Sequence, residues 1–576
     1  MKSFRVWAPK PKRVELQLGA QRHAMQAEPT GWWHAVVATA AEEYGFVLDG
    51  EGPFPDPRSP WQPHGVHGLS RRVDHDRFAW TDDGFRAPPL GSAVIYELHV
   101  GTFTPAGTFD AVIERLDHLV QLGVTHVELM PVNAFPGAHG WGYDGVALFA
   151  VQESYGGPEG LKPLVNACHA RGLAVLLDVV YNHLGPSGNY LAKYGPYFTA
   201  RHHTPWGPAV NFDGPDSDEV RRFFCDNALM WLRDYHFDGL RLDAVHAIVD
   251  TTAQPFLEQL AGEVKQLAAQ LARPLILIAE SDLNDPRLIW PTQRGGFGLD
   301  AQWSDDFHHA LHTTLTGERS GYYEDFAGLA DLAKALRQAF VYDGCYSRHR
   351  RRRHGRPPEG LSGSRFLAYV QNHDQIGNRA QGERLAHLVS AGRLKIAAAL
   401  VFTSPFVPML FQGEEWAASS PFQYFTDHAE TELAKAVREG RRREFAAFGW
   451  RPEEVPDPQA RATFERSKLK WEELGAKPHA ALLEWHRQLI AMRRQELTLT
   501  DGQRDAVNVR CDASAGWLVM ERGSLTVVCN LGDGPQAVPL AAGRHQILLA
   551  SENMPPTAEG ALTLPAEAVS ILKRVP

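Results

Sequence analysis

The spacing of hydrophobic and polar positions divides the chain into three stretches. Residues 1–86 alternate in short runs such as FRVWAP, RVELQL and WWHAVV, which are separated by Pro, Gly and polar turns. This alternation predicts antiparallel strands. From about residue 93, continuous apolar runs alternate with segments whose apolar residues have helical spacing. After about residue 500, short alternating runs such as GWLVMERG and LTVVCNLG return.

The middle stretch contains eight continuous apolar runs rich in Val, Ile and Leu. They span 94–100, 124–132, 173–182, 239–245, 275–281, 297–307, 366–374 and 407–415. Helical segments such as 109–123, 160–172 and 217–236 lie between them. Buried strands that alternate with helices predict a parallel sheet covered on both faces, and eight such repeats predict a closed barrel.

The sequence therefore predicts an α/β fold, a (β/α)8 TIM barrel with a β-domain at each end. We expect an N-terminal β-sandwich module over 1–88, the barrel over 89–497 and a C-terminal antiparallel β-domain over 498–576. A short excursion after the third barrel strand is expected at about 184–216. A length of 576 residues suits this division, because one domain usually takes about 100–200 residues.

Composition narrows the classes of partner. The net charge of −10 argues against binding to nucleic acid, and the charge run at 348–356 is expected to be a solvated loop. Five cysteines without CxxC spacing indicate a reducing compartment, so a cytoplasmic location is expected. The start, MKSFRVWAPK, lacks the apolar segment of a signal peptide. The apolar run 394–411 is interrupted by Lys and Pro, which favours a helix and a strand over a membrane span.

Ionisable residues gather at the ends of four predicted strands. The third ends in DVVYNH, the fourth in RLDAV, the fifth in AES and the seventh in QNHD. The carboxyl ends of barrel strands meet at one face, and buried strands have no packing use for charges. A lone Asp at a strand end is more often a helix cap or an ion-pair partner. Several carboxyls in one cleft, however, are what glycoside cleavage requires, one as nucleophile and one as proton donor.

These four segments resemble, in order and spacing, the signature regions of the α-amylase family, glycoside hydrolase family 13. The matching stretches are 178–183, 239–246, 279–281 and 371–374. The resemblance implies a retaining mechanism in which Asp243 is the nucleophile and Glu280 the general acid/base. Asp374 would be the third carboxylate, which stabilises the transition state. Arg241 lies on the same strand face as Asp243, so its charge would keep Asp243 ionised.

The resemblance also implies residues that hold the sugar ring under attack. His183 and His373 match two histidines that donate hydrogen bonds to this ring, and Tyr143 in WGYDG matches an aromatic platform beneath it. Each could instead have a packing role. Asn182 matches a position that helps to hold calcium in many amylases, but the excursion after it lacks an acidic ligand cluster. We therefore expect no metal and no cofactor.

Longer stretches indicate which members of the family are most similar. Segments 141–162, 182–198, 204–224 and 301–312 fit the trehalose-releasing hydrolases better than the glycogen branching enzymes. The resemblance implies cleavage of the α-1,4 bond next to the terminal trehalose of maltooligosyl trehalose. Maltooligosyl trehalose and related α-glucans are then the expected ligands. The pathway of these relatives implies a maltooligosyltrehalose synthase that makes the substrate.

The leaving-group side carries the remaining predicted contacts. Amylases follow the nucleophile with Ala-x-Lys-His, whereas here His246 and Ala replace that Lys and His. We predict that His246, Asp306, His309 and Gln375 contact substrate, although each could be structural. Two alternatives stay open: a glycogen branching enzyme, which transfers α-1,4 chains to α-1,6 positions, and a non-catalytic glucan-binding protein. The latter would be expected to lack one of the three carboxylates, and all three are present.

Overall fold

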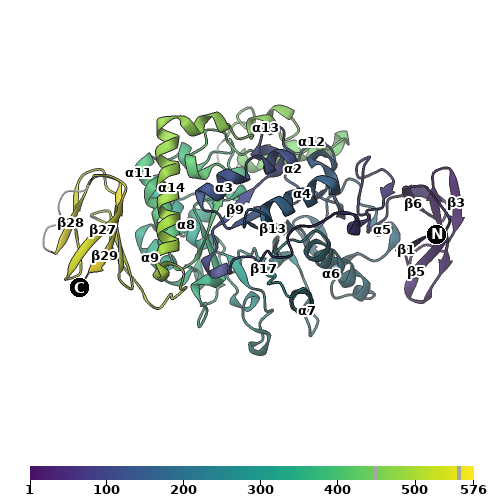
Figure 1. Ribbon diagram of the computed structural model, residues 1–576, viewed down its shortest axis with the longest axis horizontal. Helices are drawn as coiled ribbons and strands as arrows, with labels where there is room; N and C mark the ends of the chain where they lie inside the picture. Colours follow the sequence, from purple (N-terminus) through teal and green to yellow (C-terminus); the bar gives the residue numbers. More distant parts are fainter. Residues whose placement is uncertain (447–449, 554–559, 576) are drawn as a thin grey trace.

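The computed structural model describes residues 1–446, 450–553 and 560–575 and has a closed barrel of eight parallel strands at its centre (Figure 1). Each barrel strand lies inside one of the eight predicted runs, so the predicted (β/α)8 fold is confirmed. In chain order the barrel strands are β9 (Ile95–Leu98), β10 (His126–Leu129), β13 (Ala174–Val179), β16 (Gly239–Leu242), β17 (Ile276–Ala279), β18 (Ala301–Trp303), β21 (Phe366–Tyr369) and β22 (Val407–Phe411).

Helices cover the outside of the barrel, and shorter helices lie in the connections between them. The helices are α1 (Val100–Phe103), α2 (Phe109–Ile113), α3 (Leu116–Leu122), α4 (Gly157–His169), α5 (Leu191–Tyr194), α6 (Ser217–Asp234), α7 (Phe256–Leu271), α8 (Asp305–Thr316), α9 (Leu329–Gln338), α10 (His373–Gly377), α11 (Ala391–Thr403), α12 (Thr431–Ala446), α13 (Arg461–Arg466) and α14 (Lys477–Gln495). In the described part of the chain, no helix is long and apolar enough to cross a membrane.

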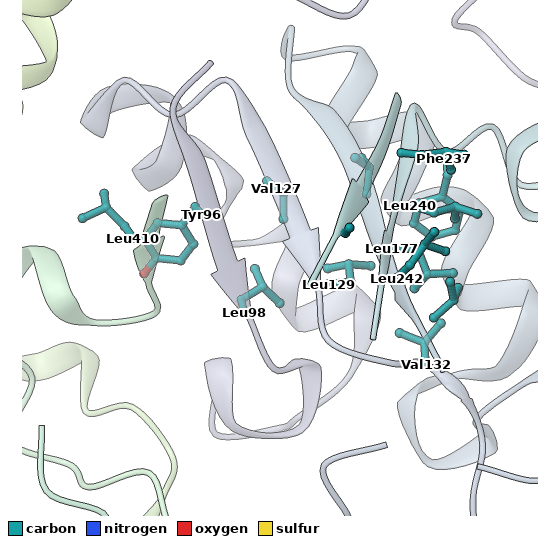
Figure 2. Packing of buried hydrophobic residues seen from close by; sticks show 14 of the residues in the cluster. Tyr96, Leu98, Val127, Leu129, Val132, Leu177, Phe237, Leu240, Leu242 and Leu410 are labelled. Atoms are coloured by element: carbon teal, nitrogen blue, oxygen red, sulfur yellow. The ribbon is translucent and has the colours of Figure 1, made fainter. Parts of the chain in front are cut away.

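Alternate residues of each barrel strand face opposite ways. Val127, Leu129 and Leu240 belong to the cluster packed under the helices (Figure 2), whereas Ile95 and Leu176 belong to a second cluster inside the barrel. Because side chains alternate along a strand, the residues between the helix-facing ones point into the barrel. This alternation directs the polar residues at the strand ends into the mouth of the barrel.

β-domains lie at the two ends of the molecule (Figure 1). The N-terminal module has two antiparallel sheets, and the ring centroids of Phe4 and Tyr44, one from each sheet, lie 5.1 Å apart. Its strands are β1 (Lys2–Trp7), β4 (Gln26–Ala27) and β5 (Trp32–Val37) in one sheet, and β2 (Val14–Leu18), β3 (Gln21–Ala24), β6 (Glu43–Leu48), β7 (Glu51–Phe54) and β8 (Ser70–Arg71) in the other.

The C-terminal domain is also antiparallel, with a larger and a smaller sheet. The larger contains β23 (Val507–Asp512), β24 (Trp517–Arg522), β25 (Leu525–Asn530), β29 (Ala568–Val575) and β27 (Arg544–Ala550), and the smaller pairs β26 (Gln536–Pro539) with β28 (Ala561–Leu564).

Three hairpins in the barrel connections bear on the site. They are β11 (Asn133–Ala134) with β12 (Ala147–Val151), β14 (Phe198–Thr204) with β15 (Gly207–Val210), and β19 (Asp343–Ser347) with β20 (Arg352–Gly355). The second hairpin lies in the excursion that follows the third barrel strand, and the third lies between β18 and β21.

Candidate active site

Arg241 is the centre of a charged cluster at the mouth of the barrel. Its Nη1 atom lies 2.8 Å from Oδ1 of Asp243 and 2.9 Å from both carboxylate oxygens of Asp178. Its Nη2 atom lies 3.7 Å from Oε2 of Glu280. Asp178 and Arg241 are directly opposite each other on neighbouring strands. The structure therefore brings Arg241, Asp243 and Glu280 together, and it adds Asp178, to which the sequence analysis gave no role.

A strained turn connects Asp243 to Glu280. Ala244 has a positive φ of 39°, which is uncommon for a residue other than glycine. Its backbone N–H donates to Oε2 of Glu280 at 2.5 Å, and the N–H of Val245 donates to the Glu280 carbonyl at 3.0 Å. Burial raises the pKa of the Glu280 carboxyl well above its usual range; Arg241 opposes this effect and the Asp243 charge adds to it. Glu280 is therefore suited to carry a proton.

His373 links the site to the barrel interior. Its Nδ1 donates to Oε1 of Glu97, on β9, at 2.5 Å, and its Nε2 lies 2.8 Å from the hydroxyl of Tyr143. That hydroxyl donates to Oδ2 of Asp178 at 2.5 Å. Burial lowers the pKa of His373, but the charges of Glu97 and Asp374 outweigh it and raise the pKa to about 9. His373 is thus an imidazolium with both ring nitrogens donating.

His183 packs against an aromatic residue to which the sequence analysis gave no role. Its Nε2 lies 3.1 Å from the carbonyl oxygen of Tyr143, and burial lowers its pKa, so the ring is neutral. The imidazole is stacked on the indole of Trp206, with centroids 4.6 Å apart and planes 7° apart. Trp206 lies in the turn between β14 and β15 and is 49% exposed. The only sequence signal for it is a Trp in the turn TPWGPA.

A cavity of about 300 Å³ adjoins Glu280 and Asp374. His309 and Gln375, two predicted contacts, line it. Burial lowers the pKa of His309 to about 3, and the Nδ1 atom of this neutral ring has no hydrogen-bond partner in the described chain. The complete lining is Glu280, Asp282, Trp303, Asp305, His309, Tyr322, His349, Arg350, Asn372, Asp374, Gln375 and Asn378.

The predicted substrate contact at Asp306 needs correction. Its Oδ2 atom accepts hydrogen bonds from Asn284 Nδ2 and from the backbone N–H groups of Val341 and Tyr342, each at 2.7 Å. The carboxylate therefore holds a connecting loop and does not line the cavity. Successive residues of a helix point about 100° apart, and the neighbouring Asp305 faces the cavity instead.

Of two further expectations about polar residues, the substrate contact at His246 stays a prediction, and the solvated loop at 348–356 is changed by the structure. His246 is exposed in the short helix Val245–Ala247 and is not among the residues that line the cavity. The charge run at 348–356 is not simply solvated, because Arg350 lines the cavity and its Nη2 lies 2.9 Å from Oδ2 of Asp282. His349 and Tyr322 also line it. These three come from the connection between β18 and β21, where no motif indicated them.

Comparison with known proteins agrees with this architecture. Residues 73–203 match the family model "Alpha amylase, catalytic domain", and residues 502–571 match "Domain of unknown function (DUF3459)". A crystal structure of a provisionally named alpha amylase from Salmonella typhimurium superimposes with a TM-score of 0.91 at 38% identity, covering 99% of this chain and 97% of that one. The barrel and these matches define a glycoside hydrolase of the α-amylase class.

Curated relatives place the chain within that class. A malto-oligosyltrehalose trehalohydrolase from Mycobacterium tuberculosis is 52% identical over 100% of this chain and 99% of its own length. One from Arthrobacter ramosus is 54% identical over 94% of each chain. The chain belongs to the malto-oligosyltrehalose trehalohydrolase family. A 1,4-alpha-glucan branching enzyme from Corynebacterium jeikeium is 29% identical over 53% of this chain, which is a weaker and partial match.

Proposed function

We propose that the protein is a retaining hydrolase that cleaves the α-1,4 bond next to the terminal trehalose of maltooligosyl trehalose. Trehalose and a maltooligosaccharide are the products. The observation that carries this proposal is the pairing of two unlike carboxyls at the mouth of the barrel, next to the cavity that Glu280 lines. Asp243 is bound by Arg241 at 2.8 Å, whereas burial raises the pKa of Glu280 and keeps it protonated. Such a pair supplies a nucleophile and an acid in one cleft.

In the first step, Asp243 attacks the anomeric carbon of the sugar on the glucan side. Its Oδ1 atom accepts a hydrogen bond from Arg241, which leaves Oδ2 for the attack. Glu280 gives its proton to the oxygen that leaves with trehalose, and a covalent glycosyl-enzyme forms. In the second step, the Glu280 carboxylate takes a proton from water, whose oxygen replaces Asp243 at the anomeric carbon. Asp374 holds hydroxyls of the distorted ring.

The two sides of the cleft suit different parts of the substrate. Tyr143, His183 and His373 lie where the ring under attack would bind, and Trp206 extends this wall toward solvent. Trehalose has no free reducing end, so the pocket must recognise hydroxyl groups. A pocket of about 300 Å³ with neutral His309 and the Asp282–Arg350 pair offers both donors and acceptors. A sugar of different shape would leave some of these polar groups unpaired.

Product analysis tests this function. Purified enzyme incubated with maltooligosyl trehalose is expected to release trehalose and to leave amylose nearly intact. The variant Asp243→Asn, assayed in parallel, should release none. A change in the iodine staining of amylose, with new α-1,6 branches and no trehalose, would instead identify a branching enzyme. Binding of glucan without any turnover would identify a non-catalytic protein.

We also infer a metabolic context from the resemblance alone. A maltooligosyltrehalose synthase would supply the substrate, and the protein would act in the cytoplasm. All five cysteines are free thiols, which is compatible with a reducing compartment. Cell fractionation tests the location. Trehalose formation from maltooligosaccharide by the mixed enzymes, with no trehalose from either alone, tests the link to a synthase.

A further inference from the structure

Asp305 is a carboxyl in the cavity to which the mechanism above gives no role. It is the first residue of α8, directly after the cap residue Ser304 at the end of β18. Its Oδ1 atom accepts a hydrogen bond from the hydroxyl of Tyr369, on β21, at 2.5 Å. In the described chain, Asp305 forms no ion pair, unlike Asp282 in the same cavity, which Arg350 neutralises at 2.9 Å.

The charges that face Glu280 come from three elements. Arg241 and Asp243 belong to β16 and the turn after it, Asp305 to α8, and Asp374 to α10. Arg241 is the single cation among them, and both Asp178 and Asp243 also bind it. An uncompensated carboxylate in the lining of the same cavity therefore disfavours ionisation of Glu280.

Asp305 can itself change charge near pH 6. Burial raises the pKa of Asp305 to about 6. The hydrogen bond from Tyr369 and the charge of Arg241 oppose this rise, and the carboxyls of Asp282 and Asp374 add to it. Above about pH 6 the side chain is a carboxylate, and below it the side chain is neutral, with the same shape and charge as asparagine.

We propose that Asp305 is a positioning residue for Glu280: its carboxylate, fixed by Tyr369 and unpaired with any cation, keeps the general acid protonated until the leaving oxygen takes the proton. This inference rests on the proposed role of Glu280. No proton moves to or from Asp305. The same negative charge acts again in the second step, where it makes the Glu280 carboxylate a better acceptor for the proton of the attacking water.

The test is the pH profile of Asp305→Asn. Asparagine keeps an acceptor for Tyr369 but lacks the charge, so Glu280 should lose its proton at lower pH. We expect the alkaline limb of kcat/KM to move toward acid by on the order of one pH unit. Below about pH 6 the kcat/KM values of the variant and the wild type should converge, because the side chain at position 305 is then neutral in both. Tyr369→Phe, which removes the donor, should move the limb in the same direction by less.

The matched control is the double variant Asp282→Asn/Arg350→Gln, which removes a carboxylate from the same pocket together with its cation. Its KM is expected to rise, but its alkaline limb should stay within about 0.2 pH unit of the wild type. The proposal would be overturned if the alkaline limb of kcat/KM for Asp305→Asn coincided with that of the wild type, or if only KM rose. Either result would show that Asp305 only contacts substrate. An equal shift in the double variant would overturn it as well.

A measurement without turnover separates this inference from the proposed function. Infrared titration of the resting enzyme, with Glu280→Gln to assign the band, gives the protonation of Glu280 directly. In Asp305→Asn this band should disappear at lower pH than in the wild type, and an unchanged midpoint would contradict the inference. If the wild type releases no trehalose, the proposed function fails, and the titration still decides the effect of Asp305. Circular dichroism checks that the variant is folded.

Discussion

Nη1 of Arg241 lies 2.8 Å from Oδ1 of Asp243, and the same nitrogen lies 2.9 Å from Asp178. A fixed, fully buried cation at this distance holds one oxygen of the Asp243 carboxylate in place. In the proposed mechanism, this contact orients Asp243 as the nucleophile before any substrate binds.

The first prediction concerns this carboxylate. Asp243→Asn keeps the size of the side chain but removes its nucleophilic oxygen, so kcat for trehalose release should fall by roughly 10³-fold or more. Circular dichroism and the melting temperature should show an intact fold, because the amide oxygen can still accept from Arg241. Activity close to that of the wild type would exclude Asp243 as the nucleophile.

The sequence alone was sufficient to predict the barrel and the charged residues at its strand ends, and the reason is physical. Strands buried on both faces must be continuously apolar, so Asp243, Glu280 and Asp374 stood out as charges at the ends of such runs. Part of the cavity lining was not predictable in this way. Tyr322 and Arg350 come from a long connection whose path depends on tertiary packing.

The sequence analysis predicted a substrate contact at Asp306, whereas the neighbouring Asp305 lines the cavity. This difference has another cause. Both residues begin α8, and one residue along a helix changes the direction of a side chain by about 100°. The segment WSDDFHH contains both carboxyls, but it does not give the phase of the helix relative to the cavity. That phase is set by Ser304, which accepts the backbone N–H of Phe307 at 3.4 Å, and by the loop that Asp306 binds.

The second prediction uses the buried position of Asp306. Asp306→Ala removes the acceptor of two backbone N–H groups, from Val341 and Tyr342, and leaves these donors buried without a partner. Each such loss costs about 1–3 kcal/mol, so the free energy of unfolding should fall by roughly 2–6 kcal/mol. Urea unfolding measures it. Glu51→Ala, at an exposed pair with Lys193, is the control and should change stability by less than about 1 kcal/mol.

The third prediction concerns the exposed aromatic wall of the cleft. Trp206→Ala removes the ring that is stacked on His183 and is 49% exposed to incoming substrate. Because an aromatic contact contributes about 0.5–1.5 kcal/mol, KM for a long maltooligosyl trehalose should rise about 2–12-fold with little change in kcat. Trp206→Phe should restore most of the affinity. A large fall in kcat with KM unchanged would contradict a role in binding alone.

The fourth prediction concerns a buried histidine that joins the connection after the N-terminal module to the barrel. His169, the last residue of α4, has its Nδ1 atom 2.7 Å from Oδ2 of Asp82 and its Nε2 atom 2.9 Å from Oδ2 of Asp238. Burial lowers the pKa of His169, but the two carboxylates outweigh it, so the folded-state pKa is raised. Folding therefore favours the protonated ring.

The sign of the pH dependence follows from this raised pKa. The stabilisation by His169 is fully present below about pH 6.5, the value in the unfolded chain, and is lost as pH rises through the higher folded-state pKa. His169→Gln should therefore lower the melting temperature at pH 5.5, by an amount equivalent to about 3–5 kcal/mol, and lower it less at pH 9. The control His64→Gln, at an exposed pair with Glu43, should differ from the wild type by less than about 1 kcal/mol at either pH. An equal loss at both pH values in His169→Gln would mean that packing, and not the charge held between Asp82 and Asp238, stabilises this junction.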